Sequence, residues 1–313
     1  MAHLQGLIAA PFTPMHADGS LNLELIPAYY RMLKGNGVQG AFICGSTGEG
    51  VSMSTKEKMA IAEAWAACTA GDAEFKVMTL VGGTSIVECQ EVARHAERVG
   101  LYGVSLTSPF YFKPADVSML AKVCIAVGEA VPDMPFYYYH IPVLTGVEFP
   151  MLSLLQEIDG RLPNFRGIKY THEDFMDFLS CMHFRDGRYD MLWGRDENML
   201  AALALGAKAG VGSTFNYAAP LYLSLMEAFE KGDLVGARIL QLQSIDMIRL
   251  LGKYGGIATG KAFMRYIGLD CGTFRLPVRN MSALQWDAFQ AEVRALGFEG
   301  FRSRVKDVLK ERG

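Results

Sequence analysis

Short apolar segments alternate with longer segments of helical periodicity along most of the chain. The first apolar segment, residues 6–11, ends at a proline and predicts a buried strand rather than a helix. Apolar residues then recur at helical spacing as Leu23, Ile26, Tyr30 and Leu33, and two glycines end the pattern. A strand followed by a helix is therefore the first unit of the chain.

The same unit recurs along the sequence up to residue 230. The predicted strands lie at residues 6–11, 40–44, 76–81, 103–106, 136–140, 167–170, 191–193 and 209–212. The predicted helices lie at residues 23–33, 54–71, 84–99, 116–129, 148–159, 173–184, 197–205 and 220–230. Ser54 and Glu57 form a capping box that opens the second helix.

Eight strand–helix units predict an α/β fold, the (β/α)8 TIM barrel. Strands that alternate with helices form right-handed parallel units, and eight is the number that closes such a sheet into a barrel. An open doubly wound sheet is the alternative. Its glycine pattern for dinucleotide binding is absent, because the first strand leads into Pro11-Phe12-Thr13-Pro14.

After residue 230 the pattern becomes purely helical. Helices are predicted near residues 233–253, 260–268 and 283–296, and a charged tail follows to Gly313. No low-complexity linker separates this part from the rest. We therefore expect a catalytic barrel at residues 1–230 and a C-terminal helical extension at residues 231–313 that packs on the barrel.

Composition restricts the class of partner. Half of the 313 residues are hydrophobic, 20% are charged and the net charge is -3, with no run of Lys or Arg. These values predict a globular protein with a small-molecule substrate rather than a nucleic acid or membrane partner. No run of about 18 apolar residues and no signal peptide are evident. Six widely spaced cysteines without a C-x-x-C pair predict reduced thiols in a cytoplasmic protein.

The predicted ends of the strands carry the residues with useful chemistry. In a TIM barrel the active site lies at the carboxyl ends of the strands. These positions hold one amine, two tyrosines and several hydroxyl and acidic groups: Ser46, Thr47, Ser108, Tyr111, Phe112, Tyr139, His140, Lys169, Thr171, Gly194, Asp196, Glu197, Ser213 and Thr214.

This set suits carbonyl chemistry through an imine. A lysine amine, Lys169, would attack a keto group, and a tyrosine would shuttle the proton that carbon–carbon bond cleavage requires. Such chemistry needs no cofactor and no metal. A lysine at its ordinary pKa of about 10.4 is protonated at neutral pH, so Lys169 must be buried or have neighbours that lower this value.

Several of these residues also allow a purely structural interpretation. The glycine-rich loop at residues 45–50 could bind a carboxylate through backbone N–H groups or simply form a tight turn. At least one of the tyrosines at residues 137–139 should only pack, because strand side chains alternate between faces. Asp196 and Glu197 could contact substrate or stabilise a helix N-terminus.

Two other patterns are expected to have no ligand. His140 and His172 are predicted to be hydrogen-bonding loop residues, because the chain has no His cluster with metal-ligand spacing. Residues 255–261 match the spacing of a phosphate-binding loop, but Ala262 stands where Ser or Thr would hold magnesium. ATP binding is therefore not expected there.

The order of six motifs resembles one enzyme family over essentially the whole chain. The motifs are GSTGEG at residues 45–50, SPFYF at 108–112, YHIP at 139–142, GIKYT at 167–171, GRDE at 194–197 and GSTFN at 212–216. They are similar to those of the N-acetylneuraminate lyase and dihydrodipicolinate synthase family of Schiff-base (β/α)8 barrels. The resemblance implies a homotetramer without a cofactor.

The resemblance also implies a role for each site residue. Lys169 would form the Schiff base with pyruvate, and Tyr139 would handle the proton. Ser46 and Thr47 would hold the pyruvate carboxylate, with Tyr111 in their hydroxyl relay.

The segment after YHIP decides the branch of the family. Leu144 stands where synthases that make dihydrodipicolinate carry an arginine, and an apolar group cannot pair a carboxylate. The chain is therefore more similar to the sialic acid lyases, in which Thr171 would contact the sugar near the imine. The polyhydroxy tail of the sugar would contact Gly194, Asp196, Glu197 and Ser213.

Some alternatives remain at this point. The nearest is another pyruvate-dependent aldolase of the same family, which would act on a different sugar acid or synthesise dihydrodipicolinate, although Leu144 argues against the synthase. A non-catalytic sugar-acid-binding barrel is the second. A metal-dependent hydrolase lacks the His cluster that it would need. Arg195 and Tyr170 depart from the pattern of related lyases, and Arg195 could shift recognition of the sugar toward an acidic or modified tail.

Overall fold

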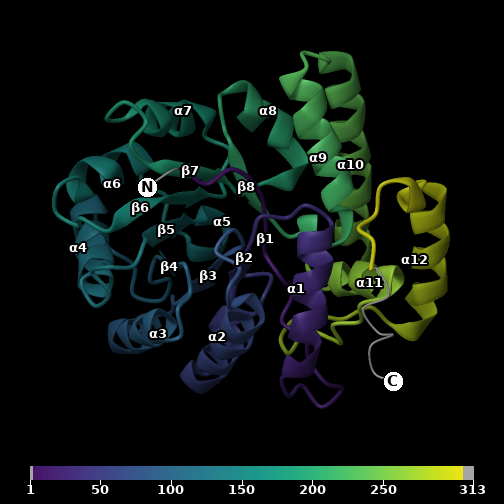
Figure 1. Ribbon diagram of the computed structural model, residues 1–313, viewed down its shortest axis with the longest axis horizontal. Coiled ribbons are helices and arrows are strands. Elements are labelled where there is room, and N and C mark those ends of the chain that lie inside the picture. Colours follow the sequence, from purple (N-terminus) through teal and green to yellow (C-terminus); the bar gives the residue numbers. More distant parts are fainter. Residues whose placement is uncertain (1–2, 306–313) are drawn as a thin grey trace.

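Eight parallel strands close into a barrel in the order in which they occur in the chain. The computed structural model describes residues 3–305. The strands are β1 (Gly6–Ala9), β2 (Gly40–Ile43), β3 (Lys76–Leu80), β4 (Gly103–Thr107), β5 (Phe136–His140), β6 (Phe165–Tyr170), β7 (Asp190–Trp193) and β8 (Ala209–Gly212). β1 pairs with β8 through four residues and completes the closure. The TIM barrel predicted from the sequence is confirmed (Figure 1).

Helices follow the strands and surround the barrel in Figure 1. They are α1 (Ile26–Gly35), α2 (Thr55–Thr69), α3 (Ile86–Arg98), α4 (Val117–Gly128), α5 (Pro142–Thr145), α6 (Met151–Ile158), α7 (Phe175–His183), α8 (Met199–Ala204) and α9 (Phe215–Glu230). The predicted capping box of α2 is present, with the Ser54 hydroxyl accepting from Glu57 N and the Glu57 carboxylate accepting from Ser54 N.

Helix bounds differ from the prediction by a few residues, and two differences are larger: α5 was not predicted and α9 begins early. Four residues form α5 directly after β5, which is too short for periodicity to reveal. α9 begins at Phe215 rather than at residue 220. Ala218 has non-helical torsion angles there, so Pro220 still occupies the first turn of the main helical segment, where the missing N–H of proline costs no hydrogen bond.

The interior of the barrel follows the strict alternation of strand residues. Tyr137 and Tyr139 point inward and pack with Phe42, Met78 and other inner residues. Tyr138 points outward into the layer between strands and helices. The expectation that one of the three tyrosines only packs is therefore confirmed, and β5 delivers its last tyrosine to the mouth of the barrel.

The C-terminal part is helical, as predicted. It contains α10 (Leu234–Tyr254), α11 (Ala258–Ile267) and α12 (Ala283–Ala295). Figure 1 shows α10 beside α9, with α11 and α12 on the same side of the barrel. The stacked rings of Tyr217 and Phe263, with centroids 4.6 Å apart, join α9 to α11.

The predicted boundary at residues 230 and 231 falls in the turn between α9 and α10. The division of the chain into a barrel and an extension stays a prediction, and residues 306–313 of that extension lie outside the described residues. None of the helices within residues 3–305 combines the length and apolar character that a membrane crossing requires.

Candidate active site

Lys169 lies near the carboxyl end of β6 and points into the barrel. It is 3% exposed, and its Nζ lies 4.0 Å from the ring centroids of both Phe42 and Tyr139. Burial among these rings penalises the charged amine and lowers the pKa of Lys169 to about 7, while the charge of Asp196 opposes the shift. A large fraction of Lys169 is thus neutral, and therefore nucleophilic, at physiological pH.

Tyr139 lies directly opposite Lys169 on the neighbouring strand. The two residues are register partners in the β5–β6 pair, and Tyr139 is 4% exposed. Burial raises the pKa of Tyr139, and the hydroxyls of Ser46 and Thr171, which approach the phenol, partly oppose that rise. The phenol therefore stays protonated at neutral pH and can relay a proton beside the amine.

The Thr171 hydroxyl is buried beside the phenol of Tyr139. Its Oγ1 has no hydrogen-bond partner of good geometry within residues 3–305. A Cβ at Gly194 would lie 1.9 Å from this oxygen, so only glycine fits beside it. A buried hydroxyl without a partner is rare in folded proteins, and this one lies next to the phenol of Tyr139, where a ligand could supply the missing bond.

The loop at residues 45–50 is a tight turn, the simpler of its two interpretations. Gly50 N donates to Gly45 O at 3.1 Å, and a Cβ on Gly50 would lie 1.7 Å from Cys44 O. The turn folds back on the end of β2 and brings the Ser46 hydroxyl to Tyr139, with Thr47 buried beside it. Carboxylate binding by this loop stays a prediction.

Asp196 is a second buried titratable group of the site. Its carboxylate accepts hydrogen bonds from Thr214 N at 2.9 Å and from Thr214 Oγ1 at 2.6 Å. Burial raises the pKa of Asp196 to about 6, and the hydrogen bonds from Thr214 oppose the rise. The carboxylate thus tethers the loop after β7 to the loop after β8 and contributes negative charge near Lys169.

Arg195 is already neutralised by two acidic residues. Its Nε lies 3.1 Å from a Glu173 oxygen, and its Nη2 lies 2.7 Å from a Glu197 oxygen. Because the chain itself supplies the carboxylates that pair with Arg195, this arginine does not require an acidic substrate tail as its partner. Glu197 is thereby fixed at the rim of the barrel.

Some predicted residues lie apart from the buried cluster. Tyr111 is 78% exposed, and its ring packs only edge-on against Phe112. Within residues 3–305 no hydrogen bond joins Tyr111 to Ser46, and the hydroxyl relay stays a prediction. Leu144 is 63% exposed on α5, and Ser213 contributes its carbonyl to Asn216 Nδ2 at 2.7 Å.

His140 differs in part from its prediction. It ends β5, as the predicted strand at residues 136–140 has it, and it is buried, with its ring 5.1 Å from that of Tyr170. Its Nδ1 has no hydrogen-bond partner in the described chain, and burial lowers the pKa of His140 to about 3. Within residues 3–305, no three His, Cys, Asp or Glu side chains are grouped to hold a metal ion.

Two structural residues of the site were not predicted. Asn216 donates to Ala10 O at 2.8 Å and accepts from the Tyr29 hydroxyl, which ties the residue after β1 and helix α1 to the start of α9. Lys261 belongs to the segment that matches the spacing of a phosphate loop. It lies within α11 and pairs with Glu49 of the loop at residues 45–50 instead. The one available signal was the position of Lys261 on the apolar face of its helix, because a lysine buried there needs an acidic partner.

Comparison with known proteins identifies the family of the chain. The model of the dihydrodipicolinate synthetase family matches residues 3–296. The N-acetylneuraminate lyase of Homo sapiens is 38% identical over 315 residues, which cover 99% of this chain and 98% of that protein.

Solved structures give the same result. The N-acetylneuraminate lyase of Proteus mirabilis superimposes with a TM-score of 0.92 at 39% identity, covering 95% of this chain and all of the other. The native N-acetylneuraminate lyase of Aliivibrio salmonicida gives 0.91 at 38% identity, covering 95% and 98%.

Proposed function

The chain belongs to the dihydrodipicolinate synthetase family, and from this premise we propose that it cleaves N-acetylneuraminate reversibly into pyruvate and N-acetyl-D-mannosamine. The observation that carries the proposal is the buried amine of Lys169, with a pKa of about 7, opposite the phenol of Tyr139. Relatives that share more than a third of the sequence over nearly full length are lyases of this specificity.

The reaction begins at the neutral amine. Lys169 Nζ attacks the keto carbon of the open-chain sugar, and loss of water leaves a protonated imine. Ser46 and Thr47 hold the carboxylate next to that carbon, through hydroxyl and backbone N–H groups. Since the imine is cationic, it withdraws electrons from the neighbouring carbon–carbon bond.

Cleavage requires a proton to move from oxygen to carbon. Tyr139 first donates its own proton to the hydroxyl that leaves as water during imine formation, and the resulting phenolate accepts the proton of the C4 hydroxyl as the C3–C4 bond breaks. The electron pair of that bond enters the imine to form an enamine. N-acetyl-D-mannosamine leaves as its aldehyde. The enamine takes the proton back from Tyr139 at C3, and water then releases pyruvate and the free amine of Lys169.

The rest of the sugar is bound along the neighbouring strand ends. The buried hydroxyl of Thr171 lies beside Tyr139 and contacts the substrate near the imine. Gly194, Asp196, Glu197 and Ser213 line the path of the polyhydroxy tail. The pairing of Arg195 with Glu173 and Glu197 favours a neutral tail over an acidic one.

Assembly into a homotetramer belongs to the same proposal. The loops after β4 and β5 are adjacent, and they expose Phe110, Tyr111, Phe112, Val143 and Leu144. Exposed apolar groups of this size and density favour contact with another chain. A neighbouring copy that covered these loops would also bury Tyr111, whose hydroxyl makes no hydrogen bond within residues 3–305.

The cytoplasm is the proposed compartment. All six cysteines are free, and five of them are buried. Buried thiols without disulfides fit a reducing environment.

A direct assay tests the activity. The protein should release pyruvate from N-acetylneuraminate, and it should condense pyruvate with N-acetyl-D-mannosamine but not with aspartate semialdehyde, the aldehyde used by dihydrodipicolinate synthases. Turnover of aspartate semialdehyde alone would assign the chain to the synthase branch. Turnover of other 2-keto-3-deoxy sugar acids in place of N-acetylneuraminate would assign it to another aldolase, and binding without turnover would indicate a sugar-acid-binding barrel.

A further inference from the structure

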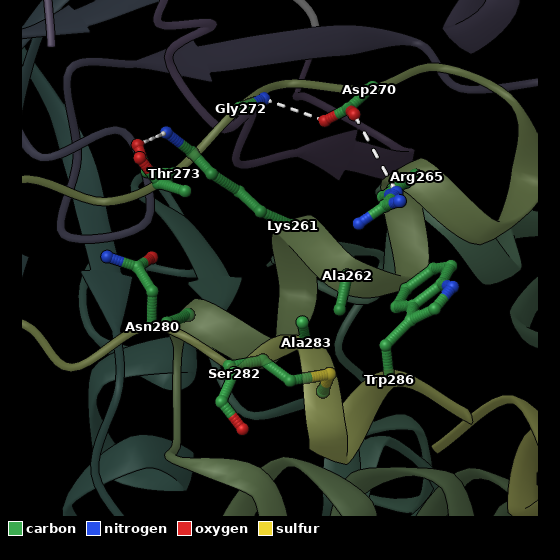
Figure 2. Close-up of a pocket in the computed structure, with 12 residues that line it drawn as sticks. Lys261, Ala262, Arg265, Asp270, Gly272, Thr273, Asn280, Ser282, Ala283 and Trp286 are labelled. Carbon is green, nitrogen blue, oxygen red and sulfur yellow. Dashed lines mark hydrogen bonds and ion pairs between the residues drawn. The ribbon is translucent and has the colours of Figure 1, made fainter. Parts of the chain in front are cut away.

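A buried ion pair connects the loop at residues 45–50 to the C-terminal helices. Lys261 Nζ lies 2.9 Å from Glu49 Oε1, and the two side chains are 2% and 5% exposed. Figure 2 shows Lys261 extending from α11 toward the carbonyl of Thr273, to which it donates at 2.8 Å. The other Glu49 oxygen accepts from Arg275 N at 2.8 Å. Both carboxylate oxygens of Glu49 are therefore held by residues beyond position 260.

Glu49 occupies a backbone conformation that needs such support. Its φ of 59° lies in the left-handed region, which residues with a Cβ rarely adopt. The neighbouring Gly48 carbonyl accepts from Thr13 Oγ1 at 2.7 Å, which is the second external hold on the loop. The turn is thus fixed from outside, by Thr13 on one side and by the pair with Lys261 on the other.

Stability alone is a weak reason for this pair. Burying two charges incurs a desolvation penalty that their attraction only partly repays, so apolar residues of similar size often serve the fold equally well. A buried pair with extra hydrogen bonds instead adds directional contacts, and these contacts fix one geometry. Here the fixed element is the loop that carries Ser46 and Thr47, three and two residues before Glu49.

We propose that Glu49 and Lys261 are positioning residues for pyruvate binding. Their ion pair holds the loop at residues 45–50 so that Ser46 and Thr47 meet the carboxylate, and the C-terminal helices thereby set the affinity for the keto-acid half of the substrate. Neither residue touches the substrate. The inference rests on the proposed role of Ser46 and Thr47 in carboxylate binding.

Kinetics in the direction of synthesis separate the two halves of the substrate. Lys261→Met and Glu49→Gln should raise the KM for pyruvate about tenfold, the change expected when one or two hydrogen bonds to a carboxylate weaken. The KM for N-acetyl-D-mannosamine should change less than about twofold, because the tail residues lie on other strands. The matched control is Lys253→Met, which breaks an exposed pair with Glu292 between α10 and α12 and should leave both KM values unchanged.

The double variant Glu49→Gln with Lys261→Met guards against misfolding, because it leaves no unpaired buried charge. It should fold and still show the raised KM for pyruvate. A normal pyruvate KM in the folded double variant would refute the positioning role. Failure of the double variant to fold, judged by circular dichroism, would also refute it, since the pair would then serve the fold as a whole.

The proposed function can fail separately. If the unaltered protein neither condenses pyruvate with N-acetyl-D-mannosamine nor forms an imine with pyruvate, the function itself is wrong. If it does both, and the variants bind pyruvate as tightly as it does, only the positioning role is wrong.

Discussion

At the scale of single residues, the site depends on where one lysine is buried. Most lysines are solvated and protonated. Lys169 lies between two aromatic rings near the end of a strand, and burial brings its pKa to about 7. The sequence alone identifies the residue and its position at a strand end, but the rings that desolvate it come from other strands, far away in the chain.

The pH dependence of the reaction follows from this shift. The amine must be neutral to attack, so its reactive fraction grows as the pH rises through about 7 and is complete well below the ordinary lysine value of about 10.4. We expect kcat/KM for N-acetylneuraminate to rise between pH 6 and pH 8 and then level off. A steady-state pH profile measures this. A rise delayed until pH 9 or above would mean that Lys169 is not desolvated.

Tyr139 allows a separate test of proton transfer. Substitution of Tyr139 by Phe keeps the ring that packs on Lys169 and removes only the hydroxyl. Cleavage should slow by about 10²-fold or more, the usual contribution of a positioned proton-transfer group. Steady-state kcat is the measurement, and Tyr137→Phe, on the same face of β5 but deeper in the barrel, is the control. Equal rates for Tyr139→Phe and the unaltered protein would remove the phenol from the mechanism.

At the scale of elements, the apolar pattern predicts the strands and helices well, and local chemistry explains the exceptions. β5 and β8 begin and end at the predicted residues, because glycine or proline lies at or near their ends. The short α5 and the break at Ala218 each depend on one or two residues, so no repeat of apolar residues in the sequence marks them. The contact of Glu49 with Lys261 joins residues 212 positions apart, and no spacing rule reaches that far.

The capping box of α2 gives a prediction at this scale. Substitution of Ser54 by Ala removes the hydroxyl that accepts from Glu57 N. The free energy of unfolding should fall by about 1 kcal/mol, the typical effect of losing an N-cap. Thermal unfolding with and without the substitution measures it. The kcat should not change, because α2 packs on the outside of the barrel. Altered kcat at unchanged stability would contradict this interpretation.

At the scale of the whole molecule, the exposed aromatic residues after β4 belong to the surface proposed for contact between copies of the chain. The family resemblance implies a place for Tyr111 in the hydroxyl relay, whereas the single chain exposes it, because the direction of a loop depends on tertiary contacts. Phe112 is 85% exposed beside it. The single chain therefore buries Lys169 and Tyr139 together but leaves Tyr111 outside this cluster.

Self-association should respond to a charge in this surface. Substitution of Phe112 by Asp places a carboxylate where an apolar contact is expected, and a buried unpaired charge strongly weakens an interface. Light scattering after gel filtration should give the mass of four chains for the unaltered protein and a smaller mass for the variant. Val87→Asp, at a site 73% exposed on α3, is the control. An unchanged mass for Phe112→Asp would exclude this surface from the assembly.

The most direct test of the central claim is chemical trapping of the imine. Incubation with pyruvate and borohydride should reduce the imine to a stable secondary amine, and peptide mass analysis should find the added mass on the peptide that contains Lys169. Lys169→Met should abolish labelling, whereas Lys208→Met, which lies just before β8 at the opposite end of the barrel, should not. Labelling of a different lysine, or no labelling of the unaltered protein, would contradict the Schiff-base mechanism.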